Sequence, residues 1–218
     1  MSLVALLDDH PAAPDDLLLA DATRDLTRAE VVDAVDVQAG ALRAAGVQPG
    51  DAVVGFASGG LRCNGFSLAR RALLDVDGRE LGGPAWTGAS HSLADELLRP
   101  SVVYAASMLE LRRHVDVHAY AHVTGGGILA NLARVLPDHC DAVVRRDAWQ
   151  RPRIFAEVQA AGAVADDEME EVFNLGLGML VVVPGDAAHA ALDGIWSVGH
   201  DAWVVGEITA GHGRAQMG

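Results

Sequence analysis

A histidine, a threonine and three consecutive glycines stand between a strand-like segment and a helix-like one. They are His122, Thr124, Gly125, Gly126 and Gly127. Glycines let a backbone approach a ligand closely, and free N–H groups at the start of a helix attract anions. The spacing therefore predicts a phosphate-binding turn. A tight turn without a ligand is the alternative, because glycine serves turns of many kinds.

A second loop of small and polar residues follows the apolar segment 52–57. It contains Ser58, Gly60, Arg62 and Asn64 and leads into helix-like sequence. Arg62 would supply a permanent cation, and the Asn64 amide can both donate and accept. This loop is a second candidate for ligand contacts, and a capped helix start is the alternative. A third small-residue turn, 173–179, predicts only close backbone packing beside a buried strand.

Alternation along 115–123 places four polar residues on one strand face, where two imidazoles could chelate a metal. These are Asp116, His118, Tyr120 and His122. A solvated strand face is the better interpretation of this pattern, and we expect no metal ligands here.

The net charge of the chain limits the classes of molecule that it can bind. The chain has 218 residues, with 30 acidic against 16 cationic side chains and a formal net charge of −14. Such a surface does not neutralise nucleic-acid phosphates, so no nucleic-acid partner is expected. All the cationic residues are arginine. Without lysine the chain cannot form a lysine Schiff base, and it has neither a P-loop lysine nor a lysine that binds an acyl-adenylate.

Cysteine usage and hydropathy favour a cytoplasmic protein. Cys63 and Cys140 lie far apart and form no metal-finger or disulfide pattern. The first ten residues have no basic residue and too short an apolar run for a signal peptide. The longest apolar stretch, 175–184, falls short of the roughly 20 residues that cross a membrane. We therefore expect no membrane contact.

The elements that must position the candidate residues alternate between strands and helices. Strands are predicted over 52–57, 115–123, 142–145, 178–183 and 202–208. Helices are predicted over 66–74, 92–98, 106–114, 128–136, 154–161 and 187–192. This pattern predicts an α+β fold, a mixed β-sheet with helices packed on it.

A different pattern precedes this domain. Segments 17–20 and 21–25 suggest a hairpin, and Thr27 with Glu30 resembles a capping box that opens a helix ending near Ala45. The turn 48–51 separates the two patterns. We predict an N-terminal hairpin-helix appendage at 1–47 and a main domain at 48–218.

The three small-residue segments, in this order, resemble the C-terminal domain of the aminoimidazole ribonucleotide synthetase family, the phosphoribosylformylglycinamidine cyclo-ligases of purine biosynthesis. The resemblance runs from about Gln48 to the end of the sequence. It rests on the segments 47–51, 58–65, 96–104, 122–127, 131–137, 149–155, 168–179 and 202–207.

This resemblance implies an ATP-dependent ring closure on a nucleotide substrate, with ATP and Mg²⁺ as cofactors. It implies His122 as a catalytic residue, nucleotide contacts from Thr124 to Gly127, and a substrate cleft lined by the 58–65 loop. The family's metal ligands and most of its dimer interface belong to an N-terminal domain that residues 1–46 do not resemble. A homodimer or a separately encoded N-terminal half is the expected partner, and a non-catalytic nucleotide- or phosphate-binding module is the alternative function.

Several positions depart from the family pattern. Arg62 and Cys63 stand where the family usually has His and Ser, Gly59 replaces a Ser, and Ala130 replaces an acidic residue. Further departures are Ser101, Val102 and Ala105, which replace polar or basic residues. Residues 1–46 more weakly resemble the start of acyl-adenylate-forming ligases, which makes a fragment of such a ligase a remote alternative.

Overall fold

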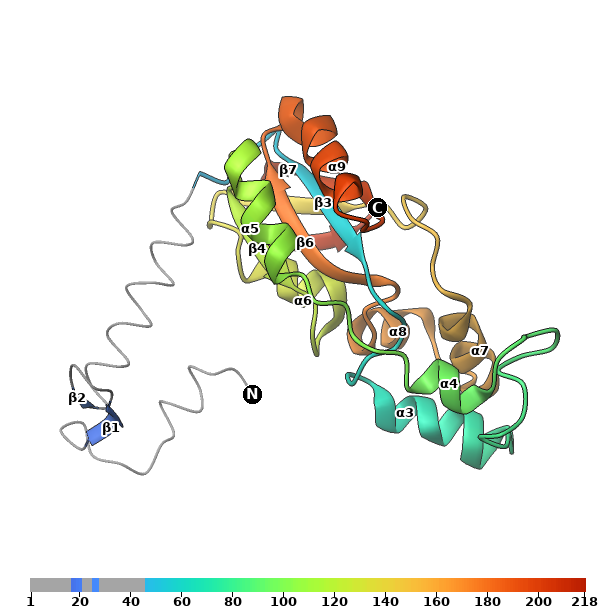
Figure 1. The fold of residues 1–218 in the computed structure, drawn as a ribbon. Helices are drawn as coiled ribbons and strands as arrows, with labels where there is room; N and C mark the ends of the chain where they lie inside the picture. Colours follow the sequence, from blue (N-terminus) through green and yellow to red (C-terminus); the bar gives the residue numbers. More distant parts are fainter. Residues whose placement is uncertain (1–16, 21–24, 28–45) are drawn as a thin grey trace. The chain divides into compact units, whose positions relative to one another are not determined.

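The computed structural model describes residues 17–20, 25–27 and 46–218 (Figure 1). The chain divides into two units, 1–45 and 46–218. In the first unit, β1 (Leu17–Ala20) pairs antiparallel with β2 (Asp25–Thr27). The predicted helix ending near Ala45 lies outside the described residues. The predicted division into 1–47 and 48–218 stays a proposal.

The main unit is built on one six-stranded mixed sheet. Neighbouring strands are antiparallel except for the parallel pair β5 and β8. Across the sheet the order is β4 (Ala119–His122), β6 (Leu177–Val183), β3 (Ala52–Ala57), β7 (Ala202–Ala210), β5 (Cys140–Val144) and β8 (Ala215–Met217). The predicted α+β class is therefore confirmed.

Helices surround this sheet. They are α3 (Phe66–Arg70), continued by the π-helix η1 (Arg71–Val76), α4 (Leu93–Leu97), α5 (Ala105–His114), α6 (Gly127–Ala133), α7 (Arg153–Gly162), α8 (Asp166–Val172), the 3₁₀ turn η2 (Gly185–Ala187) and α9 (Ala188–Ser197). Local sequence determines where some of them begin. Ser92 caps α4, because its hydroxyl accepts from the Asp95 N–H while the Asp95 carboxylate accepts from the Ser92 N–H.

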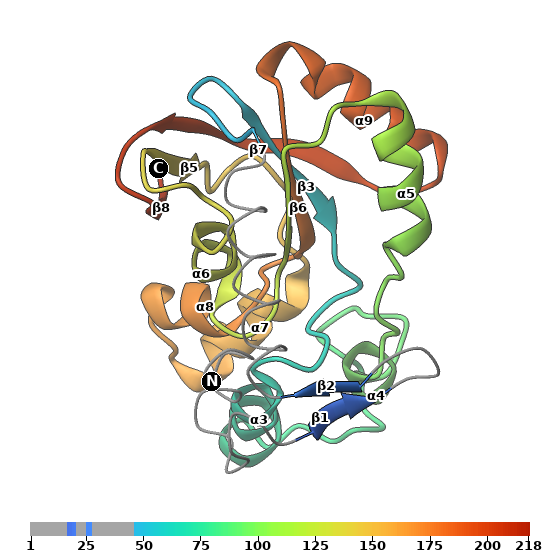
Figure 2. The same ribbon diagram turned by 90° about the vertical axis from the view of Figure 1, so that its left-hand side faces the viewer.

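Both faces of the sheet are covered, which explains why its central strands are apolar on both sides. Helices α5 and α9 pack on one face, where Val54, Phe56 and Ile195 are buried (Figure 2). Helix α6 lies on the other face, over Val53 and Leu180, and belongs to the same core cluster as α7 and α8. Burial on two faces leaves the ends of the strands as the places where loops can meet a ligand.

Some predicted elements were wrong in extent or missing. The predicted strand 115–123 begins only at Ala119, because the Val115 N–H bonds to the Leu111 carbonyl and closes α5. Helix α8 was not predicted, since its acidic sequence buries only Met169 and shows no apolar stripe. The short strand β8 was also missed. Within the described residues, no helix is both long and apolar enough to cross a bilayer.

The close approach of β6 to Tyr104 gives a test of the packing. A side chain at Gly178 would collide with the Tyr104 hydroxyl, which donates to the Ala57 carbonyl at 2.7 Å. Overfilling a packed core costs about 1–3 kcal/mol. We expect Gly178→Ala to lower the free energy of unfolding in urea by that amount, whereas Gly82→Ala, where nothing lies within 4 Å, should change it little. A Gly178→Ala effect that stays undiminished in a Tyr104→Phe background would contradict this packing.

Candidate functional site

Three loops meet at one end of the sheet. Strand β6 lies between β3 and β4 and is antiparallel to both. The start of β6 therefore lies beside the ends of β3 and β4. The predicted loop after β3, the turn before β6 and the glycine turn after β4 are adjacent for this reason. Figure 1 shows β3 running toward this end, where α3, α4, α7 and α8 gather.

A buried amide fastens two of these loops together. Asn174 is 4% exposed. Its Nδ2 donates to the carbonyls of Gly60 at 2.9 Å and Leu61 at 3.1 Å. Its Oδ1 accepts from the Ser58 hydroxyl and the Gly176 N–H, both at 2.8 Å. Asn174 thus holds the loop after β3 in a fixed position against β6. The small residues of this turn predicted only close packing, and the role of Asn174 was not predicted, although an asparagine two residues before a glycine is a signal for such a turn.

Arg62 and His122 form the polar centre of the site. The Arg62 Nη2 donates to the His122 Nε2 at 2.7 Å, and Nη1 donates to the carbonyls of Val123 at 3.0 Å and Gly178 at 3.4 Å. Arg62 has a φ of 60°. This left-handed backbone is unfavourable for a side chain of its size, so the surrounding contacts must hold it. The guanidinium therefore bridges the ends of β4 and β6.

The contact sets the protonation state of His122. Arginine only donates hydrogen bonds, so the His122 Nε2 must accept, and the ring is neutral with its proton on Nδ1. Partial burial of the ring, and then the positive charge of Arg62, lower the pKa of His122 below its usual 6.5. Nearby, burial raises the pKa of Tyr104 to about 12, and its hydroxyl remains a donor to Ala57.

The glycine turn is partly closed and partly open. The Gly127 N–H donates to the Thr124 carbonyl at 3.2 Å, and the buried Gly127 packs against the Glu170 backbone. Asn131 fastens the turn, donating to the Gly127 carbonyl at 2.6 Å and accepting from the Thr124 hydroxyl at 3.0 Å. The N–H groups of Gly125 and Gly126 have no acceptor among the described residues. Two of the three predicted glycine donors therefore stay free.

The two sides of this turn differ in charge. An amide side chain lies on one side, since a Cβ on Gly125 would be 3.3 Å from the Asn64 Nδ2. Gly126 borders a hollow of about 380 Å³ that three acidic residues line, one of which, Glu170, pairs with Arg146 at 2.8 Å. Its lining residues are Gly126, Leu129, Ala130, Asp167, Glu170 and Glu171. A phosphate would be repelled from the acidic hollow and favoured on the side of Asn64 and Arg62.

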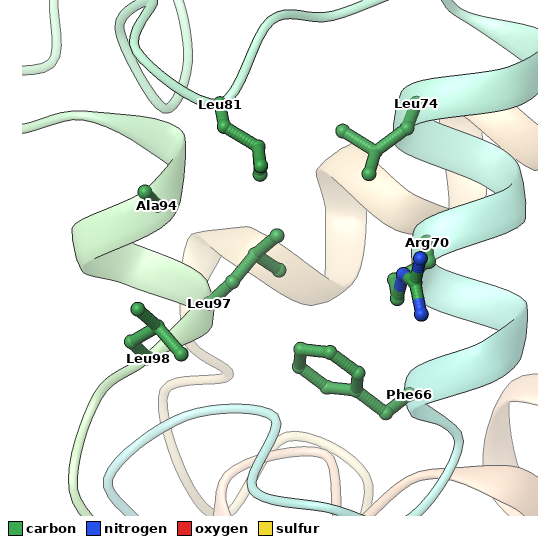
Figure 3. A pocket seen from close by; sticks show the side chains of 7 residues that line it. All are labelled: Phe66, Arg70, Leu74, Leu81, Ala94, Leu97 and Leu98. Atoms are coloured by element: carbon green, nitrogen blue, oxygen red, sulfur yellow. The ribbon is translucent and has the colours of Figure 1, made fainter.

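A different hollow lies between α4 and the helix formed by α3 and η1. It has a volume of about 260 Å³. Figure 3 shows its apolar side chains facing one another across the gap, with Arg70 at the edge. They are Phe66, Leu74, Leu81, Ala94, Leu97 and Leu98. This groove suits an apolar group and supplies few donors for an anion.

The polar residues around β4 have separate partners. The His118 Nδ1 bonds to the buried Asp51 at 2.7 Å, and the Tyr120 hydroxyl donates to the Met108 carbonyl. Asp116 is 86% exposed and lies 3.7 Å from the His118 Nε2. Within the part of the chain that the structure describes, no three His, Cys, Asp or Glu side chains are placed to hold a metal ion. The alternative of a chelating strand face therefore has no support from their positions.

Of the predicted site residues, the structure brings together Arg62, His122, Asn64 and Gly125. Ser58 and Gly60 lie behind them, bonded to Asn174. The Thr124 hydroxyl and the Gly127 carbonyl bond to Asn131 inside the turn. Cys63 is exposed and Cys140 is buried, and neither forms a disulfide.

Comparison with known proteins identifies the domain. The family model described as "AIR synthase related protein, C-terminal domain" matches residues 48–218. The chain belongs to this family. The resemblance seen in the sequence is thereby confirmed, and the sheet described above is that of the family.

Curated relatives carry the cyclo-ligase name. The phosphoribosylformylglycinamidine cyclo-ligase of Symbiobacterium thermophilum is 45% identical over 173 residues, which cover 75% of this chain and 47% of that protein. A putative phosphoribosylformylglycinamidine cyclo-ligase of Streptomyces fradiae is 43% identical over 163 residues, 75% of this chain and 89% of that protein. The chain spans about half the length of the first of these relatives.

A solved structure shows the same fold at greater distance. Thiamine-monophosphate kinase from Stenotrophomonas maltophilia is 21% identical, with a TM-score of 0.53, and the match covers 78% of this chain and 50% of that one. At this identity the likeness concerns the fold alone. The weaker resemblance of residues 1–46 to acyl-adenylate-forming ligases stays a prediction.

The hydrogen bonds of Asn174 predict a strong effect on stability. Asn174→Ala leaves the carbonyls of Gly60 and Leu61 and the Gly176 N–H without their partner in a buried place. We expect the free energy of unfolding to fall by about 3 kcal/mol. Asn64→Ala removes the same group at a half-buried position and should cost less than about 1 kcal/mol. Equal losses in urea denaturation would contradict the fastening role.

The Arg62 contact predicts a measurable titration. In the full chain, NMR of the His122 ring should give a pKa below 6.5, because burial and a neighbouring cation both disfavour the imidazolium. Arg62→Gln should raise this pKa part of the way to 6.5, since burial is the larger cause. Arg71→Gln makes the same charge change on an exposed residue and should leave it unchanged. The folded form binds the proton less readily than the unfolded chain, so His122 should reduce stability as the pH falls below about 6.5. A pKa at or above 6.5 would contradict the contact.

Proposed function

We propose that this chain supplies the C-terminal half of a phosphoribosylformylglycinamidine cyclo-ligase site, for the ATP-dependent ring closure to aminoimidazole ribonucleotide in purine biosynthesis. Family membership and the names of the relatives support the class of reaction. The observation that carries the proposal is the convergence of Arg62, His122 and the free N–H groups of Gly125 and Gly126 at one end of the sheet. A cytoplasmic location belongs to the same proposal.

The residues fit a nucleotide better than a metal. Bound ATP would supply the phosphoryl group that activates the substrate's formyl oxygen, which the substrate amine then displaces. On this chain, Gly125 and Gly126 would donate to phosphate oxygens, Arg62 would add positive charge, and Asn64 would orient the ligand. Thr124, Gly127, Ser58 and Gly60 would act by holding these loops. Because no described cluster suits Mg²⁺, we assign the metal no ligands on these residues.

A second candidate function is a binding module without its own turnover, or one half of a split enzyme. The match covers 47% of the Symbiobacterium thermophilum protein, so the matched part corresponds to about half of such a protein. Half of a shared active site supplies only part of the orientation on which catalysis depends. Partners would then be a second copy of the chain or a separately encoded N-terminal half.

Calorimetry and a turnover assay separate these functions. The full chain is titrated with Mg-ATP, and phosphate release is then measured with formylglycinamidine ribonucleotide, with and without the separately produced N-terminal half of the Symbiobacterium relative. Turnover by the chain alone supports the cyclo-ligase, turnover only with the added half supports a split enzyme, and binding without turnover supports a module. Absence of ATP binding in every combination contradicts all three.

The glycine donors predict a directed loss of nucleotide affinity. A Cβ at Gly125 meets only the end of the Asn64 side chain, so Gly125→Val should fold while blocking access to its N–H. We expect ATP affinity to fall about tenfold or more, the equivalent of one lost charge-assisted hydrogen bond. Gly126→Val should weaken binding as well, with added backbone strain because Gly126 has a φ of 92°. Gly82→Val is the control, and equal affinity for ATP in all variants would remove the glycine turn from the proposal.

A further inference from the structure

The charge around Arg62 is unusual for this acidic chain. Arg62 is half-buried, and none of the ion pairs in the described part of the chain includes it. The partially buried Arg79, in contrast, pairs with Asp77 and Glu157. A half-buried cation without a counter-charge is costly unless something else compensates it. Two carbonyls and a neutral histidine compensate Arg62 only in part.

The guanidinium also has donors to spare. Arginine carries five N–H bonds, one on Nε and two on each terminal nitrogen. The hydrogen bonds to Val123, Gly178 and His122 use both N–H groups of Nη1 and one of the two N–H groups of Nη2. The Nε–H and the second Nη2–H have no acceptor among the described residues. Donors on two nitrogens of one guanidinium match the spacing of two oxygens of a phosphate.

The surroundings define where such an oxyanion would lie. Arg62 bonds to His122 and Val123, which precede the free N–H of Gly125 by three and two residues, respectively. The carboxylates of Asp167, Glu170 and Glu171 line the hollow on the Gly126 side of the turn. An anion beside Arg62 therefore meets donors, whereas one in the hollow meets negative charge.

We propose that Arg62 binds a phosphate oxyanion of the ligand at this site and that His122 is a positioning residue for Arg62. The inference deepens the proposed function and rests on it for the identity of the site. His122 was predicted as catalytic, but its Nε2 is occupied by Arg62. Accepting that hydrogen bond fixes the guanidinium in place. An acceptor at the same point, without the ability to carry a proton, serves this role equally well.

NMR titration of the full chain tests the proposal directly. The Nε resonance of Arg62 and the backbone amides of Gly125 and Gly126 are followed while inorganic phosphate, ribose 5-phosphate or ADP is added. A shift of the Arg62 Nε with any of the three supports the proposal. A lower Kd for ribose 5-phosphate assigns Arg62 to a sugar phosphate, and a lower Kd for ADP assigns it to the nucleotide. Shifts confined to Gly125 and Gly126 overturn this inference while the proposed nucleotide site stands, and silence of all the signals overturns both.

Variants separate binding from positioning. Arg62→Gln should weaken phosphate-ligand binding about tenfold or more, and Arg71→Gln, which removes a charge from an exposed position, should not. His122→Ala should weaken binding several-fold, and the loss should disappear in the Arg62→Gln background. His122→Gln keeps an acceptor and should bind within about twofold of the unaltered chain. Binding as weak in His122→Gln as in His122→Ala, with both variants folded by NMR, would overturn the positioning role.

Discussion

The antiparallel placement of β6 between β3 and β4 is the constraint on which the site depends. It brings loops that are separated by more than a hundred residues, from Ser58 to Asn174, to the same end of the sheet. Strand pairing alone gives only proximity. The buried Asn174 turns proximity into fixed geometry by bonding the backbone on both sides. The sheet is covered on both faces, so its end is where backbone N–H groups can lack a protein acceptor without the cost of burying an unpaired polar group.

The distribution of charge then determines which surface near the site would attract an anion. The chain has a net charge of −14, so an anion approaching at random meets repulsion. At the site, carboxylates line one side of the glycine turn and are not paired with Arg62 on the other. Glu170 is partly neutralised by Arg146 at 2.8 Å, whereas the charge of Arg62 remains available. In the proposed function, this local cation in an acidic protein would confine an anionic ligand to one small region.

The sequence predicted the strands and the loops better than it predicted which groups remain free. Period-two alternation located Ala119, Ala121 and Val123 in the core, and the glycines marked the turn after β4 correctly. The side-chain partners could not be predicted, because they join distant segments: Arg62 meets His122 across 60 residues, and Asn174 meets Gly60 across 114. Helix α8 was not predicted because it is held by contacts with α6 and α7, and its own sequence has no apolar stripe.

Two departures from the family pattern are physically linked. The resemblance implies a serine at position 59 and a histidine at position 62. In this chain a side chain on Gly59 would collide with the Pro100 carbonyl, so the present path of the loop requires glycine there. The same path carries Arg62, with its left-handed backbone, into reach of His122. With serine at 59 the loop would have to move away from the Pro100 carbonyl, and the same loop carries Arg62 three residues later. The residues at 59 and 62 are therefore best exchanged together when the family residues are restored.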